Sequence, residues 1–228
     1  MADLTYFMLG FALDPVEGAY RAGMDYLNQQ FAEAQQEHEE LLRSAAAEGR
    51  DLYEFDEETG QGYDAGEHSY YRQIVIENSR QAHRQAFATM IHHAWEKHVC
   101  FLLRVPEYRY RSAYAEVAKE RGLTIDRLGL ERLRKTANCI KHESAELYDA
   151  HPEMFDKTEL DLSDAELSPK QQKNNKRISE AGMRGNWLDA LRLTDQDIAD
   201  FIGAVRKSAL PGEKFRQEWR KQPIQGVP

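Results

Sequence analysis

Apolar residues recur at helical spacing over long stretches of this chain, with polar residues between them. From about Pro15 to Gly49 the recurring residues stand three and four apart, the period of one face of an α-helix: Tyr20, Met24, Leu27, Phe31 and Ala34. The Glu-, Gln- and Ala-rich sequence at 32–47 continues this pattern with strong helix formers. The pattern therefore predicts a first long amphipathic helix over about 15–49.

A second long helix is predicted for Ser69–Arg104, where apolar residues and histidines again recur at near-helical spacing and Pro106 follows. The segment 56–67 between the two helices is acidic and contains three glycines, which predicts a loop. The apolar sequence before Pro15 predicts an arm that docks on the core or on a partner. Between the two, the sequence favours a packed first turn or a short strand.

Three further helices are predicted in the remainder of the chain. A short one covers Ser112–Arg121, and a longer one begins at the helix cap Asp126 and runs to about Ala150. The last covers Thr194–Ser208, and its first four residues resemble a capping box. The sequence at 151–190 is irregular, and no segment alternates convincingly with the period of a strand. We therefore expect an all-α protein, a single helical domain over 1–228 built as an antiparallel bundle of four to five helices, with a long loop-rich excursion at 151–190.

Composition and charge limit the classes of function. The chain has 228 residues, of which 41% are hydrophobic and 30% charged, and its formal net charge is −9. An acidic total argues against broad, nonspecific nucleic-acid binding, which needs a basic face, but it leaves room for a local basic groove. Cys100 and Cys139 form no disulfide framework, and the longest apolar stretch, 6–13, is far shorter than a membrane span. The sequence therefore predicts a cytoplasmic protein that does not enter the membrane.

The fourth predicted helix carries the candidate site. Arg134, Asn138 and His142 stand four residues apart, so they stack along one side of the helix. Arginine can hold a phosphate, histidine can transfer a proton near neutral pH, and asparagine can orient either group. Lys135 and Lys141 flank the stripe as candidate phosphate-binding residues. Such a ledge suits binding and cleaving a phosphodiester without a metal ion or cofactor, although a solvated helix face with these residue types is also common.

The sequence Leu133–His142 resembles the signature helix of HEPN-type helical bundles, in which an arginine precedes a histidine on one helix. Ala145, Leu147 and the sequence 151–155 are similar to the residues downstream of that motif in the family. The resemblance implies an up-and-down α-helical bundle and a metal-independent endoribonuclease, often part of a toxin–antitoxin or phage-defence system. It also implies a homodimer in which two motif helices build one RNA-cleaving cleft. Arg134 would then grip the scissile phosphate, His142 would transfer protons and Asn138 would support them.

The chain departs from the family pattern in two ways. Seven residues separate Arg134 from His142, more than in the usual motif, and Lys135 occupies the position after the arginine that is commonly asparagine. Some HEPN-like proteins bind RNA or partners without cutting, and the resemblance also implies an antitoxin or defence partner for this chain. The second hypothesis is therefore a noncatalytic helical interaction module that forms a homodimer.

One further pattern raises the question of a metal. His93 and Glu96 stand three residues apart, the spacing of the histidine and glutamate of carboxylate-bridged metal bundles, but the second such helix that those sites need is absent from the sequence. We therefore expect no metal site. Glu96 could instead approach the motif helix and tune His142, and His98 lies on the apolar stripe, where a buried core histidine is expected.

Overall fold

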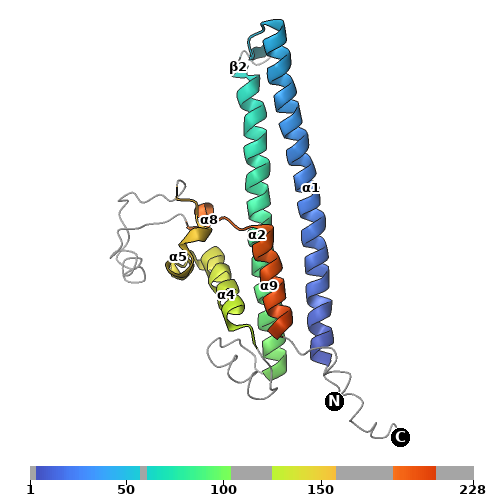
Figure 1. Cartoon of the computed structure of the whole chain (residues 1–228), viewed down its shortest axis with the longest axis vertical. Coiled ribbons are helices and arrows are strands. Elements are labelled where there is room, and N and C mark those ends of the chain that lie inside the picture. Colours follow the sequence, from blue (N-terminus) through green and yellow to red (C-terminus); the bar gives the residue numbers. More distant parts are fainter. Residues whose placement is uncertain (1–3, 57–60, 104–124, 158–186, 209–228) are drawn as a thin grey trace, which may run out of the picture. The chain divides into compact units, whose positions relative to one another are not determined.

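The computed structural model describes residues 4–56, 61–103, 125–157 and 187–208, and within them helices dominate (Figure 1). The prediction of an all-α fold is confirmed. Beside the helices, the described residues contain one β-hairpin of two short antiparallel strands. In chain order the elements are α1 (Leu4–Glu48), β1 (Tyr53–Asp56), β2 (Gln61–Asp64), α2 (Ala65–Leu103), α4 (Arg127–His142), α5 (Glu146–Ala150), the 3₁₀-helix η1 (Pro152–Met154), α8 (Trp187–Ala190) and α9 (Asp195–Ser208).

The chain divides into two compact units, and helices α1 and α2 each contribute to both of them. Unit 1 comprises Met1–Glu17 and Arg84–Pro228, and unit 2 comprises Gly18–His83. The sequence did not suggest this division, because the helical periodicity continues through the positions at which the two units meet. Whether residues 1–228 behave as one folding domain stays a prediction.

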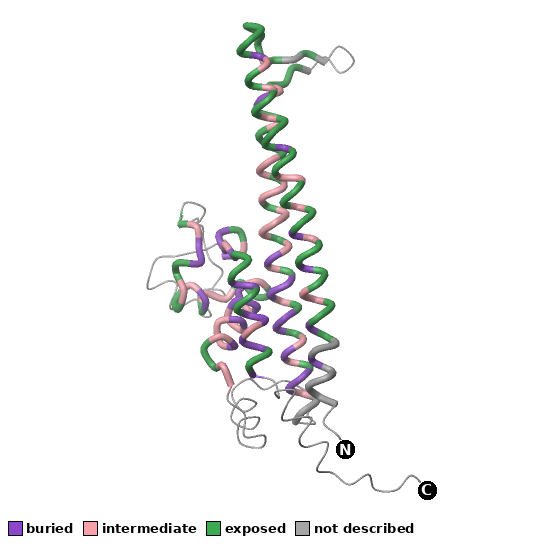
Figure 2. Tube along the Cα trace, turned by 45° about the vertical axis from the view of Figure 1, so that its right-hand side comes forward, coloured by how far each residue is buried: buried purple, intermediate pink, exposed green. Residues whose placement is uncertain are grey.

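Unit 2 is an antiparallel pair of helices joined by the β-hairpin (Figure 1). The two helices approach closely at Gly23, where an added Cβ would lie 2.4 Å from the imidazole of His83. That imidazole also stacks on Tyr20, with ring centroids 5.5 Å apart. Buried residues are sparse along this pair, as Figure 2 shows, because only one seam between two helices is available to cover them.

Unit 1 contains most of the buried core. Trp95, Leu133 and Phe201, from α2, α4 and α9, are almost fully buried. Helix α4 packs against α9, and the close approach is marked by Gly129, where an added Cβ would lie 2.5 Å from the Cβ of Ala204. The chain after α4 folds back over α4 through α5 and α8. Aromatic rings from these segments contact one another at centroid distances of 5.0–5.8 Å: Tyr148, Phe155 and Trp187.

Three sequence predictions about element boundaries need correction. The apolar arm before Pro15 is part of α1, and Leu9 and Leu13 on it are buried, because a helical N-terminal segment places them on one side of unit 1. The acidic segment 56–67, expected to be a loop, contributes to a β-hairpin. The helix predicted to run from 126 to 150 ends at His142, because Glu143 adopts a left-handed conformation with φ 52° and its N–H donates to the carbonyl of Cys139.

Other predictions about the elements are confirmed or lie outside the described residues. Thr194 and Asp197 cap α9 reciprocally, since the backbone N–H of each donates to the side chain of the other. The predicted helix at 112–121 and most of the excursion at 151–190 lie outside the residues that the structure describes. No helix in the described part of the chain is long and apolar enough to cross a membrane.

Candidate functional site on helix α4

Helix α4 holds its polar stripe in place through a capped start and a buried apolar side. Asp126 caps the helix by accepting a hydrogen bond from the backbone N–H of Gly129 at 3.0 Å, and its own N–H donates to the hydroxyl of Ser208 on α9. The buried residues of the helix are Leu130, Leu133, Thr136, Ala137 and Cys139. Arg132 forms an ion pair with Asp197, which binds α4 to the start of α9. These contacts fix which side of α4 faces away from the core.

Arg134 lies at the edge of that core and is already paired. Its side chain is only 15% exposed, and one guanidinium nitrogen donates to Glu131 at 3.0 Å and to Glu146 at 2.8 Å. Burial disfavours the positive charge, but the two carboxylates more than offset burial and raise the pKa of Arg134 above its ordinary value. Arg134 is therefore a charged residue that joins α4 to α5, rather than a side chain extended into solvent.

The other end of the stripe is open. Lys141 and His142 are exposed at the last turn of α4, and Asn138 is half-buried between them and Arg134. Lys135 is half-buried, and its ammonium lies 3.9 Å from Glu131. The candidate residues thus separate into an ion-paired half, Arg134 and Lys135, and an exposed half, Lys141 and His142.

The helical rise sets how far apart the two ends stand. Eight residues at 1.5 Å each place Arg134 and His142 about 12 Å apart along the axis. A single α4 helix therefore cannot bring both side chains onto one phosphate without a large excursion of the arginine. We call Arg134, Asn138, Lys141 and His142 the α4 ledge.

Helix α2 contributes residues next to the ledge that the sequence did not assign to it. His92 is buried, and its Nδ1 lies 3.5 Å from Glu96, which is equally close to the exposed His93. Burial is the main cause that lowers the pKa of His92 from 6.5 to about 4. Glu96 opposes this shift, and the positive charges of Lys141 and Arg134 add to it. The cations of α4 therefore act on a neutral imidazole of α2.

Sequence reasoning missed this role of His92, because adjacent histidines on one helix give no sign of which one faces the partner helix. The only signal was the histidine-rich sequence at 91–98, interpreted through His93 and Glu96. The described contacts of Glu96 are with the two histidines of its own helix, and whether it tunes His142 stays a prediction. His98 is buried beside Trp95, with ring centroids 5.7 Å apart, as expected for a core histidine.

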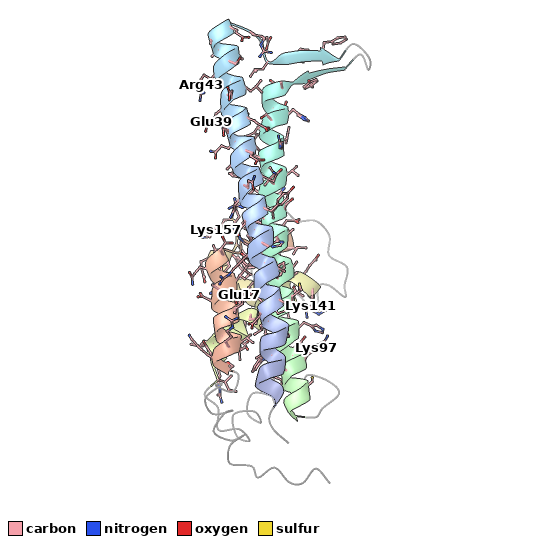
Figure 3. The ribbon with its side chains drawn as sticks, turned by 90° about the vertical axis from the view of Figure 1, so that its right-hand side faces the viewer. Glu17, Glu39, Arg43, Lys97, Lys141 and Lys157 are labelled. Carbon is pink, nitrogen blue, oxygen red and sulfur yellow. The ribbon has the colours of Figure 1, made fainter. Side chains whose placement is uncertain are left out.

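The surface beside the ledge carries a second lysine. Figure 3 labels Lys97 on α2 and Lys141 on α4, and the two side chains project at the same edge of that view. Both residues are exposed. Within the described ranges, no group of three or more His, Cys, Asp or Glu side chains is placed to hold a metal ion. The chemistry available at the ledge is therefore that of cations, an amide and imidazoles.

Comparison with known proteins finds no family model that matches the chain, no similar curated protein and no similar solved structure.

Proposed function

We propose that the chain is a HEPN-like RNA-binding protein whose α4 ledge contacts the RNA backbone, with metal-independent cleavage as its activity. The observation that carries the proposal is the exposed pair Lys141 and His142 at the end of α4, on the same side of the helix as the charged Arg134 two turns earlier. The cations of the ledge, Lys141 and Arg134, are strong enough to help lower the pKa of a buried imidazole on the neighbouring helix. A ledge of this kind offers a phosphate a cation and a titratable proton carrier in a chain that is acidic overall.

Cleavage requires Arg134 and His142 to act on one phosphodiester, and a homodimer would bring them together. If two α4 helices pair antiparallel about a two-fold axis at Asn138, Arg134 of each helix stands opposite His142 of the other, since both lie four residues from the axis. His142 would then take the proton from a ribose 2′-hydroxyl, and Arg134 would stabilise the charge that develops on the phosphate.

The carboxylates paired with Arg134 occupy the guanidinium that would bind a phosphate, so one of them would have to move. Glu146 is 51% exposed, so its carboxylate can move into solvent and leave one side of the guanidinium to a phosphate. Glu131 is 33% exposed and lies on α4 itself, where it would continue to hold the arginine. Binding of RNA would thus exchange one carboxylate partner of Arg134 for a phosphate.

The same ion pairs favour a second candidate function, a noncatalytic interaction module. Arg134 is mostly buried and joins α4 to α5, which is the usual arrangement of a structural ion pair. In that case the ledge would serve as a contact surface for another protein or a second copy, and the chain would cut no RNA.

The variant Glu146→Gln separates the two candidates. If Arg134 must leave Glu146 to bind a phosphate, removing the carboxylate charge strengthens RNA binding or cleavage. If the pair is structural, the variant lowers the unfolding midpoint and gives no gain with RNA. Cleavage of diverse labelled RNAs is measured in EDTA, with His142→Ala as the inactive variant and the exposed His68→Ala as its control. Cleavage that survives His142→Ala, or wild-type protein that cuts none of the RNAs, rejects the nuclease hypothesis.

The two-fold arrangement has its own test. In a Cys100→Ser background, Asn138→Cys places two thiols at the proposed axis, where a disulfide requires Cα atoms about 4.4–6.8 Å apart. Mild oxidation then gives a covalent dimer. Arg127→Cys, exposed at the start of α4, is the matched control and stays monomeric. A monomer from both variants contradicts pairing through the ledge.

A further inference from the structure

The end of unit 2 that carries the β-hairpin exposes large apolar side chains. Six of them are 44–63% exposed: Tyr53, Phe55, Tyr63, Tyr70, Tyr71 and Val75. Single exposed apolar residues are ordinary on a protein surface, but a gathering of aromatic side chains within one short stretch of structure is not. We call these six residues the hairpin-end surface. They do not share one face, because Tyr63 pairs with Glu54 and so lies on the face of the hairpin opposite Tyr53 and Phe55, and the ring of Tyr70 contacts His38 of α1.

The strand pairing explains why the aromatic residues of the hairpin are exposed. Tyr53 and Phe55 alternate with Glu54 on β1, so they lie on one face of the two-stranded sheet. The ring of Tyr53 lies over Gly62 of β2, where an added Cβ would stand 1.7 Å from the phenol oxygen. A sheet of two strands has no further strand to cover this face, so the face stays open.

The first turns of α2 add an open helical face. His68, Tyr71, Val75, Asn78 and Ala82 follow one another at steps of three and four, and all five are exposed. Tyr71 and Val75 stand one turn apart on this stripe. Both are apolar, and both are exposed, Tyr71 to 54% and Val75 to 62%. This stripe has the pattern of a helix face that packs against another helix. At its first residue the ring of His68 contacts Tyr63 of β2, with ring centroids 6.1 Å apart, and Tyr71 and Val75 stay exposed.

The charge of unit 2 indicates what would cover it. Between Gly18 and His83 there are 14 Asp and Glu residues and only five Lys and Arg residues. The excess of nine acidic residues accounts for the whole formal charge of −9 of the chain, so unit 1 is neutral by sequence. The apolar surface thus belongs to a strongly acidic unit.

This charge disfavours a second copy of the same surface as the occupant. Two units with nine excess negative charges each would repel over roughly the 8–10 Å at which physiological salt leaves charges unscreened. A basic partner is instead attracted by the acidic unit. This attraction speeds the approach of the partner and fixes its orientation. Tyrosine rings also suit lysine and arginine, whose cations bind the faces of aromatic rings.

From the apolar stripe and the charge of unit 2 we infer that the hairpin-end surface binds a basic amphipathic helix of another protein. The apolar face of that helix packs on Tyr71 and Val75 of α2, and its lysines or arginines face the acidic side chains of unit 2. This binding is independent of RNA contact by the α4 ledge, since it uses a different part of the chain.

A fluorescence anisotropy titration of the full chain tests the inference with three labelled peptides of about 20 residues. The first is an amphipathic helix of leucine and lysine, the second has the same composition in scrambled order, and the third has glutamate in place of lysine. The inference predicts that the amphipathic basic peptide binds at least about tenfold more tightly than the scrambled one. The acidic peptide is expected not to bind.

Variants locate the binding surface. The double variant Tyr71→Ser, Val75→Ser is expected to weaken binding of the basic peptide about tenfold, as loss of a central apolar contact does. Tyr26→Ser, an equally exposed tyrosine of α1 in the same unit, is the matched control and leaves binding unchanged. Circular dichroism confirms that both variants retain their helices.

Three results would overturn the inference. The first is equal binding of the ordered and scrambled basic peptides, which would mean nonspecific attraction. The second is a double variant that binds as tightly as wild type, or a wild type that binds none of the peptides. The third is concentration-dependent self-association of wild type in sedimentation that the double variant abolishes, because the occupant would then be a second copy of this chain.

Discussion

The buried imidazole of His92 makes the stability of unit 1 depend on pH. Its pKa is lowered from 6.5 to about 4, chiefly by burial and further by the cations of α4. Between these two values the unfolded chain binds a proton that the folded chain does not bind. The free energy of unfolding therefore rises with pH through this window and falls as the pH drops from 6.5 towards 4.

The magnitude is set by the difference between the two pKa values. Each unit of pKa difference corresponds to about 1.4 kcal/mol, so complete protonation would cost roughly 3 kcal/mol. Much of this loss falls between pH 7 and pH 5, where His92 contributes about 2 kcal/mol. Most carboxylates remain ionised in that range, so it isolates the histidine better than a titration to lower pH would.

The assay is urea unfolding at several pH values between 5 and 7, followed by tryptophan fluorescence. Trp95 and Trp187, the tryptophans within the described residues, belong to unit 1, so their signal reports the unit that contains His92. Wild type is expected to lose about 2 kcal/mol more over this range than His92→Leu. His93→Leu, at the exposed neighbouring histidine, is expected to follow wild type. Equal pH slopes for wild type and His92→Leu would refute the reasoning.

Three other predictions concern the packing of unit 1. Gly129→Ala is expected to destabilise by about 1–3 kcal/mol in urea unfolding, because its Cβ would collide with α9, whereas Gly203→Ala, which meets nothing within 4 Å, stabilises by up to about 1 kcal/mol. Burial raises the pKa of the Cys139 thiol to about 12, so maleimide labelling followed by mass spectrometry should modify Cys100 before Cys139 in the folded protein. Arg132→Met removes the ion pairs of Arg132 with Asp197 and Asp200 and should lower the midpoint of thermal unfolding. An unchanged midpoint would show that these ion pairs do not stabilise the packing of α4 on α9.

Periodicity predicted the long helices because their buried side repeats every three or four residues. It placed the start of the first helix too late, at about Pro15, although α1 continues through that proline. The cap of α9 was also predictable, since Thr194 and Asp197 bond within four residues of sequence. The end of the α4 helix was not predictable. It depends on Glu143 adopting a left-handed conformation, for which asparagine or glycine is the usual signal. The hairpin was missed because its strands are only four residues long.

For the candidate site too, the sequence predicted the helix positions but not the contacts made between elements. The sequence places Arg134, Asn138 and His142 on one side of a helix, and the structure keeps them on α4. It could not indicate that Glu146, beyond the end of α4, binds Arg134, because that contact depends on the turn at 143–145. Nor could it indicate that the charges of Lys141 and Arg134 reach His92 on α2, an interaction made only by tertiary packing.

The most direct test of the account is the salt dependence of binding to a labelled single-stranded RNA, measured by anisotropy for wild type and Lys141→Ala. Lys207→Ala, at an exposed lysine of α9, serves as the control. If the α4 ledge binds the RNA backbone, Lys141→Ala weakens binding and reduces the slope of log affinity against log salt by about 0.7, the value for one lost phosphate contact on a single strand. Affinity and slope that stay at the wild-type values for Lys141→Ala, or RNA that does not bind wild type at all, would contradict the account.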